Sequence, residues 1–200
     1  MSNSGQATGS GNCGPRLYLA GPDVFAPDAV ARGARKQAIC AALGASGLFP
    51  LDNAPPPPGL DPAQTAHHIY RANIALMHGA DACIADLSPF RGPNADDGTA
   101  FEVGWMIAAG KPVLGHVDDP RSLTERSSIA GLADAEGRPT DADGWWVEDF
   151  GWPANLMLVA GAQQNGGKVF VQAADAEPDD AFRRAVAAAV RLFRESQRFR

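Results

Sequence analysis

Residues 81–117 read DACIADLSPFRGPNADDGTAFEVGWMIAAGKPVLGHV, and this stretch carries the pattern of a strand, a loop, a helix and a second strand. The apolar runs Asp81–Leu87 and Lys111–Val117 predict two buried strands. Between them, the spacing predicts a helix from about Thr99 to Ala109 that ends at Gly110. Strands joined by a helix are typical of a parallel pair with a right-handed crossover.

The same alternation continues on both sides of this stretch. Short apolar runs predict three more strands, at Arg16–Ala20, Gly47–Leu51 and Lys168–Gln172. Helix-start residues predict four further helices, beginning near Pro27, Asp61, Pro153 and Pro178. About five parallel strands flanked by helices indicate one doubly wound, flavodoxin- or Rossmann-like α/β domain over residues 16–200. In such sheets a ligand lies beyond the carboxyl ends of the strands.

Several segments carry more specific expectations. The helical spacing predicts an apolar face for the first helix at Val30, Ala34, Ala38 and Ala41, and for the last helix at Phe182, Val186, Ala189 and Phe193. The run Pro55–Pro58 predicts a stiff spacer that cannot join a sheet. Residues 1–15 predict a disordered tail, and residues 118–150 a long functional or mobile excursion.

Composition and charge narrow the class of protein. The chain has 200 residues, of which 45% are hydrophobic, so it can form a normal core. A net charge of −6 argues against binding to the phosphate backbone of a nucleic acid. No apolar run approaches the ~20 residues that cross a bilayer, so no membrane partner is expected. The three cysteines lack CxxC spacing and the N-terminus lacks an apolar signal core, which favours a reducing cytoplasm.

The loop and helix of the quoted stretch hold the densest chemical signal. Glu102 lies about one turn into the helix, where backbone amides favour an ionised carboxylate. Such a carboxylate at a strand-end crevice can attack an electrophilic carbon or take a proton. Asp97 or Gly98 is expected to cap this helix. A glutamate in a first turn is also common for helix stability alone, and Asp96 and Asp97 are common as loop or capping residues. The residues by themselves leave both interpretations open.

Taken together, six motifs in order make the sequence resemble the nucleoside 2-deoxyribosyltransferase family. They span roughly residues 16 to 195. The motifs are YLAGPDVF (18–25), ADLSPFRG (85–92), DDGTAFEVG (96–104), GKPV (110–113), VEDFG (147–151) and NLM (155–157).

The resemblance implies the cleavage of the N-glycosidic bond of a 2′-deoxynucleoside and transfer of the sugar to a free nucleobase. Glu102 matches the nucleophile that forms a covalent deoxyribosyl ester, so the overall reaction retains configuration, as in retaining glycosidases. Tyr18 matches the tyrosine that orients this nucleophile. Asp96 matches the carboxylate that holds the sugar hydroxyls and assists protonation.

The resemblance also implies a set of substrate contacts. Phe25 or Phe90 is expected to stack on the base, and Arg91 to bind one of its exocyclic carbonyls. Asn73 stands where some members have a base-contacting aspartate, and an amide cannot transfer a proton. If protonation depended on that position, Asp96, Asp86 or water must serve instead. The remaining expected substrate-binding residues are Gly21, Pro22, Asp23 and Gly98.

Partners follow from the same resemblance. Asn155 and Met157 match residues that reach a neighbouring subunit's site, so a homo-oligomer is expected. No metal or organic cofactor is suggested, because the histidines lack metal-ligand spacing. His67 and His68 are adjacent and are interpreted as a mostly solvated pair.

Two alternative functions are open. The first is a hydrolase of the same fold that cleaves deoxynucleoside 5′-monophosphates. The charge of Asp23 in the loop after the first strand argues against it, because it would repel a phosphate dianion. The second is a nucleoside-sensing module without catalysis, which the combination of Tyr18, Asp96 and Glu102 disfavours.

Overall fold

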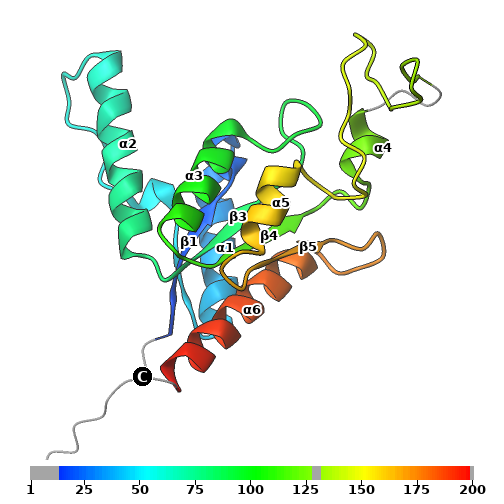
Figure 1. The fold of residues 1–200 in the computed structure, drawn as a ribbon. Coiled ribbons are helices and arrows are strands. Elements are labelled where there is room, and N and C mark those ends of the chain that lie inside the picture. The colour runs from blue at the N-terminus through cyan, green and yellow to red at the C-terminus, as the bar shows by residue number, and fades with distance from the viewer. Residues whose placement is uncertain (1–13, 128–131, 199–200) are drawn as a thin grey trace, which may run out of the picture.

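The computed structural model describes residues 14–127 and 132–198 (Figure 1). The tail predicted over residues 1–15 therefore lies almost entirely outside the described residues. Five parallel strands form one sheet in the order β2-β1-β3-β4-β5, which confirms the predicted doubly wound α/β class. The strands are β1 (Arg16–Ala20), β2 (Ser46–Leu48), β3 (Ala82–Asp86), β4 (Val113–Val117) and β5 (Lys168–Val171).

Helices cover both faces of this sheet. Helices α1 and α6 pack on one face, and α3 and α5 pack on the other (Figure 1). No helix in the described part of the chain is long and apolar enough to span a membrane. The helices are η1 (Pro22–Phe25), α1 (Ala29–Ala42), η2 (Pro50–Asp52), α2 (Pro62–Gly79), α3 (Asp97–Ala108), α4 (Leu123–Ser127), α5 (Leu156–Ala162) and α6 (Asp180–Gln197).

The alternation of side chains along β1 divides the core in two. Leu17 and Leu19 pack against α1 and α6, whereas Tyr18 and Ala20 belong to the cluster beneath α3. This division follows from the period of two in a strand, which sends successive side chains to opposite faces. Tyr18 is fully buried and lies on the α3 side. The sheet thereby directs its one aromatic hydroxyl toward the helix that carries Glu102.

Two sequence predictions about these elements are wrong. The second strand ends at Leu48, two residues after it begins, because Pro50 starts a short 3-10 helix. The predicted apolar face of α1 is exposed: Val30 is 76% exposed, and the buried residues of the helix include Ile39, Cys40 and Lys36. Lys36 lies on the face of α1 that packs against the sheet, where it pairs with Asp23 and Asp86. Hydrophobic spacing alone cannot predict a buried face that contains a lysine. The apolar face predicted for α6 is largely correct, since Phe182, Val186 and Ala189 are buried.

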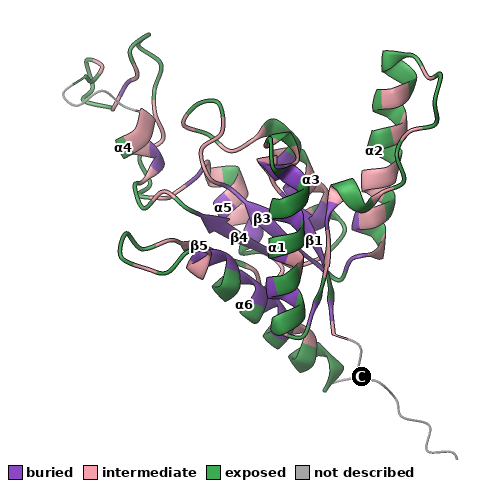
Figure 2. Ribbon diagram, turned by 180° about the vertical axis from the view of Figure 1, so that it is seen from behind, coloured by how far each residue is buried: buried purple, intermediate pink, exposed green. Residues whose placement is uncertain are grey.

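Helix α2 projects from the body of the molecule and has one buried residue, Met77 (Figure 2). Its first turn is stabilised by Asp61, whose side chain accepts from the Gln64 amide at 2.7 Å while the Gln64 side chain accepts from the Asp61 amide. At its other end, the Lys111 ammonium donates to the carbonyls of Met77, His78 and Ala80 at 2.7–2.8 Å. The helix is thus fixed chiefly at its C-terminal end.

Candidate active site

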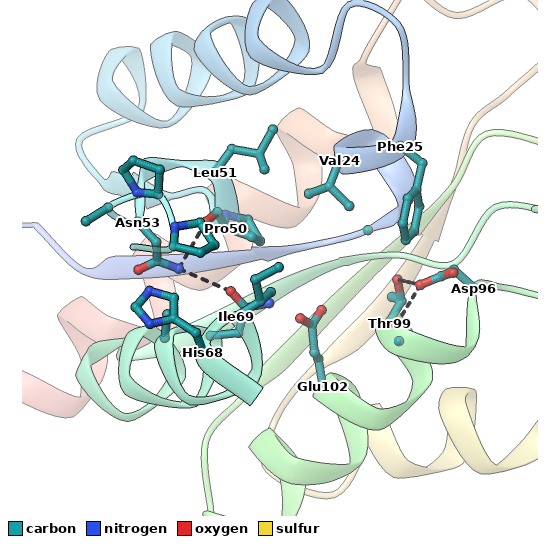
Figure 3. Close-up of a pocket in the computed structure, with 17 residues that line it drawn as sticks. Val24, Phe25, Pro50, Leu51, Asn53, His68, Ile69, Asp96, Thr99 and Glu102 are labelled. Atoms are coloured by element: carbon teal, nitrogen blue, oxygen red, sulfur yellow. Dashed lines mark hydrogen bonds between the residues drawn. The ribbon is translucent and has the colours of Figure 1, made fainter. Parts of the chain in front are cut away.

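A cavity of about 570 Å³ lies at the carboxyl ends of the strands, on the α3 side of the sheet. It collects residues from the loop after β1, the segment after β2, helix α2 and the start of α3 (Figure 3). The lining residues are Gly21, Val24, Phe25, Pro50, Leu51, Asn53, Ala54, Pro55, Pro56, His68, Ile69, Ala72, Asn73, Asp96, Gly98, Thr99 and Glu102. The place agrees with the general location of ligands in open α/β sheets.

Glu102 and Tyr18 meet at the floor of this cavity. The Tyr18 hydroxyl donates a short hydrogen bond to Glu102 Oε1. Burial raises the pKa of Glu102 to about 7; the Tyr18 hydrogen bond partly opposes that shift, and the charge of Asp96 adds to it. Burial and the neighbouring carboxylate raise the pKa of Tyr18 well above its ordinary range, so the tyrosine keeps its proton. The result is a carboxylate that is weakly solvated and held in one orientation.

Asp96 begins helix α3 and lines the same cavity. Its Oδ2 accepts from the Thr99 backbone amide at 3.0 Å and from the Thr99 hydroxyl at 3.2 Å. This is the arrangement of a helix N-cap, so Asp96 caps the helix, and the prediction of Asp97 or Gly98 as the cap is wrong by one or two residues. Because its other oxygen makes no hydrogen bond among the described residues, the capping role leaves Asp96 able to accept from a ligand.

The cavity has two chemically different ends (Figure 3). Asn53 and His68 lie at one end, Phe25, Thr99 and Asp96 lie at the other, and Glu102 lies between them. The Asn53 end is walled by apolar side chains, among them Leu51 and Ile69. A flat apolar group with a few polar edges therefore fits this end, and a hydroxylated group fits the other.

Of three predicted contact residues that stack on one another, Phe25 lines the cavity, whereas Phe90 and Arg91 do not. The rings of Phe25 and Phe90 lie 5.7 Å apart at 18°, and the Arg91 guanidinium lies 5.2 Å and 4.7 Å from their centroids. Phe25 lines the cavity and is 56% exposed. Arg91 has a φ of 54°, a left-handed conformation that is uncommon for a residue with a side chain. The cation–π contacts are thus made from a strained loop.

Asp23 and Asp86 lie away from this cavity, on the α1 side of the sheet. The Lys36 ammonium bridges them, at 2.7 Å from Asp23 Oδ2 and 3.4 Å from Asp86 Oδ2, and all three residues are buried. Arg32 adds a second cation 3.3 Å from Asp23. Lys36 is shared with Asp86 and Arg32 with Asp28, so the two cations offset part of the Asp23 charge, and Asp23 does not line the Glu102 cavity. The prediction that Asp23 would repel a phosphate stays a prediction.

The charges of this buried cluster stabilise one another. Burial opposes ionisation of Asp86, but His116, Lys36 and hydrogen bonds from Ser88 outweigh it and lower the pKa of Asp86 far below its ordinary range. Burial likewise opposes the charge of Lys36, and the two aspartates outweigh it and raise the Lys36 pKa. Asp86, His116 and Asp118 place potential metal ligands within 4.8 Å of one another, but the ammonium already supplies a cation to Asp86.

Gly21 connects this cluster to the Glu102 cavity. It lines the cavity, and a Cβ at this position would lie 2.9 Å from Asp86 Cβ. Any side chain would therefore push the loop after β1 away from the end of β3. Pro22 begins the 3-10 helix η1 in this loop and does not line the cavity.

Asn155 and Met157 lie on the other side of helix α3. They line a separate groove of about 660 Å³ with α3 residues such as Val103 and Gly104. Asn155 caps α5: its Oδ1 accepts from the Met157 amide at 3.0 Å, and its Nδ2 donates to Glu148 at 2.6 Å. Met157 is 71% exposed. Within one chain, neither residue reaches the cavity of Glu102.

Sequence reasoning missed part of the cavity. His68 lines it, although the histidine pair was interpreted as solvated, and Pro55 and Pro56 line it although the run was interpreted as a spacer. A usable signal existed for the histidine: His68 precedes Ala72 by one helical turn and therefore shares its face. No comparable signal marks the prolines, whose position depends on where the chain after β2 turns.

Fold and cavity together define an α/β protein with a desolvated carboxylate at the carboxyl edge of a parallel sheet. A family model described as nucleoside 2-deoxyribosyltransferase matches residues 17–157. The chain therefore belongs to the nucleoside 2-deoxyribosyltransferase family, and it is an enzyme.

Individual relatives agree with this assignment. The structure of a 2-desoxiribosyltransferase from Leishmania mexicana is 35% identical, with a TM-score of 0.63, over 86% of this chain and 97% of that one. An uncharacterized protein of Schizosaccharomyces pombe is 34% identical over 186 residues, which cover 86% of this chain and 87% of the relative. A conserved protein from Enterococcus faecalis, 22% identical with a TM-score of 0.53 over 86% and 96% of the chains, shares the fold.

Proposed function

We propose that this enzyme transfers 2-deoxyribose from a deoxynucleoside to a free nucleobase through a covalent ester on Glu102. The observation that carries the proposal is the pairing of a partly buried carboxylate, whose pKa is raised to about 7, with a tyrosine hydroxyl in a cavity of nucleoside size. Desolvation makes the ionised carboxylate a stronger nucleophile than one in water. Asp96 also lines this cavity, but its Oδ2 caps helix α3 through Thr99.

The reaction is two displacements at the same carbon. A Glu102 oxygen attacks C1′ of the sugar, the C1′–N bond breaks, and its electron pair leaves with the base, which takes up a proton. A nitrogen of the second base then attacks C1′, breaks the ester and returns the carboxylate, and that base gives up its proton. Two inversions give net retention, and both pass through an oxocarbenium-like state.

The neighbouring residues have distinct roles in these steps. Tyr18 donates to one oxygen of Glu102 and leaves the other free to attack. Asp96, held by Thr99, accepts hydrogen bonds from the sugar hydroxyls and assists proton transfer. Phe25 packs against the substrate from the edge of the cavity. Because Glu102 must be ionised to attack, the acid limb of kcat/KM is expected near pH 7.

Assembly and setting belong to the same proposal. Met157 is exposed beside Asn155, the residue that caps α5, and we propose a homo-oligomer in which the two residues complete the adjacent site. The buried free thiols of Cys40 and Cys83 suit a reducing cytoplasm, where the enzyme would act in nucleotide salvage.

The test follows products from one deoxynucleoside with and without a second base. Formation of a new nucleoside only when the base is present, with retained configuration at C1′, is expected. Mass spectrometry of protein quenched without acceptor is expected to find one deoxyribosyl group on Glu102. Because Asp23 does not line the cavity, deoxynucleoside 5′-monophosphates are included as donors. Free sugar without base would show hydrolysis, and inversion at C1′ would rule out the ester.

A further inference from the structure

Two asparagine side chains from different segments meet at the far end of the cavity. Asn53 follows η2 and Asn73 lies in α2, and both line the cavity. Asn53 Nδ2 donates to the Pro50 carbonyl at 3.0 Å and to Asn73 Oδ1 at 3.1 Å. The two bonds use both hydrogens of the Asn53 amide nitrogen.

These two hydrogen bonds determine the orientation of the Asn73 side-chain amide. The Pro50 carbonyl can only accept, so the nitrogen of Asn53, not its oxygen, must point toward it. The second hydrogen of that nitrogen then faces Asn73, which must answer with its oxygen. The Asn73 amide nitrogen is left without a hydrogen-bond partner among the described residues, so it is a free donor.

The position of a bound base follows from the proposed function, on which this inference rests. The base is joined through its glycosidic nitrogen to C1′, which must lie beside Glu102. Its opposite edge then points away from Glu102, toward the end of the cavity where Asn53 lies (Figure 3). That edge carries a carbonyl oxygen in hypoxanthine, guanine, uracil and thymine, and an amino group in adenine and cytosine.

We propose that Asn53 is a positioning residue that makes Asn73 select bases with a carbonyl on this edge. The Asn73 N–H donates to the carbonyl oxygen of an oxo base. An amino base presents a second donor there, which cannot pair with the Asn73 N–H. The Pro50, Leu51 and Ile69 side chains accept no hydrogen bond, so the amino group would have to turn away from Asn73 to reach the Asn53 oxygen or His68. An unpaired polar contact of this kind costs about tenfold or more in specificity.

The experiment compares bases that differ at one position. Hypoxanthine and adenine, and separately uracil and cytosine, are supplied as acceptors with one donor, and the ratio of kcat/KM is measured. A ratio of about ten or more in favour of the oxo base is expected within the pair that is transferred. Calorimetric binding of 2′-deoxyinosine and 2′-deoxyadenosine to the Glu102→Gln protein is expected to give the same order without turnover.

Substitution of Asn53 separates positioning from simple packing. In Asn53→Asp the side chain can no longer donate, so Asn73 is expected to turn its nitrogen toward residue 53 and its oxygen toward the cavity. The preference then inverts in favour of amino bases, although Asn73 itself is unchanged. Asn53→Ala frees the Asn73 amide and is expected to bring the ratio close to one. Asn73→Asp is expected to favour amino bases directly.

A matched control is available. Like Asn53, Asn165 donates two hydrogen bonds through its Nδ2, here to the backbone carbonyls of Ile107 at 3.1 Å and Lys111 at 3.4 Å, away from the cavity. Asn165→Asp is expected to lower stability and leave the base ratio unchanged. A wild-type ratio at or below one, or equal ratios in wild type, Asn53→Asp and Asn53→Ala, would overturn the inference. If no base is transferred, the proposed function fails, and the calorimetric comparison still decides the role of the two asparagines.

Discussion

Two carboxylates lie at the carboxyl edge of the sheet on opposite faces, Asp86 buried and Glu102 partly buried, and they face different neighbours. Asp86, on the α1 side, faces the Lys36 ammonium, and its pKa falls far below the ordinary range. Glu102, on the α3 side, faces a neutral tyrosine hydroxyl, and its pKa rises to about 7. Desolvation acts on both groups, but the cations beside Asp86 outweigh it, whereas at Glu102 it outweighs the tyrosine hydrogen bond, which fits the proposed role of Glu102.

The comparison shows how the neighbouring group distinguishes a carboxylate that stabilises the fold from one that could act as a nucleophile. A cation beside a buried carboxylate stabilises the charge so well that the group has little tendency to attack or bind a proton. A neutral donor orients the carboxylate but leaves its charge poorly compensated. Gly21, which packs against Asp86 and lines the Glu102 cavity, lets the two environments lie side by side.

The largest expected effect comes from removing the reactive carboxylate. Glu102→Gln is expected to lower the rate of base exchange by at least about 10³-fold, because the amide cannot form the ester.

The same substitution also tests stability. Folding raises the pKa of Glu102 from about 4.5 to about 7, so the wild-type protein loses stability as pH rises through that range. The variant should therefore be at least as stable as wild type at pH 8, as measured by urea unfolding. Glu195→Gln, an exposed change on α6, controls for the substitution. Retention of full activity by Glu102→Gln would contradict the assignment.

The next effect concerns the anchor. Lys36→Met leaves Asp23 and Asp86 buried without their shared cation and is expected to cost about 3–5 kcal/mol in unfolding free energy. Because the folded-state pKa of Asp86 is lowered, its stabilisation is present above about pH 4 and is lost in more acidic solution. The difference between variant and wild type should therefore shrink as pH falls. Lys168→Met, at an exposed strand end, is the matched control. A loss below about 1 kcal/mol at pH 7 would show that the ion pairs are dispensable.

The smallest effect tests the neutral donor. Tyr18→Phe removes a hydrogen bond that lowers the pKa of Glu102, so the acid limb of kcat/KM should move upward by about one pH unit. The variant then loses more activity at pH 6 than at pH 8. Tyr70→Phe makes the same chemical change on an exposed ring of α2 and should leave the limb in place. If the acid limb of kcat/KM stays in place in Tyr18→Phe while activity falls equally at all pH values, Tyr18 only packs against the helix.

The sequence predicted the strands and the place of the site because both depend on local patterns. Apolar runs between turn residues marked four strands closely, and the cap before α3 placed Glu102 at the carboxyl edge of the sheet. The buried face of α1 was not predictable in this way, because it is set by Lys36 binding two aspartates that are distant in sequence. The roles of Asp23 and Asn53 have the same origin, since each depends on a partner that only the folded chain brings near.

Helix α2 contributes side chains to the cavity but little to the hydrophobic core. It contributes Asn73 and Ile69 to the cavity, yet it buries one residue and is fixed at one end by Lys111. Substitutions on its cavity face therefore remove little packing from the two hydrophobic cores, one on each face of the sheet. If Asn73 contacts the base as proposed, base preference can be changed by substitutions in this helix without disturbing the strand that brings Tyr18 to Glu102.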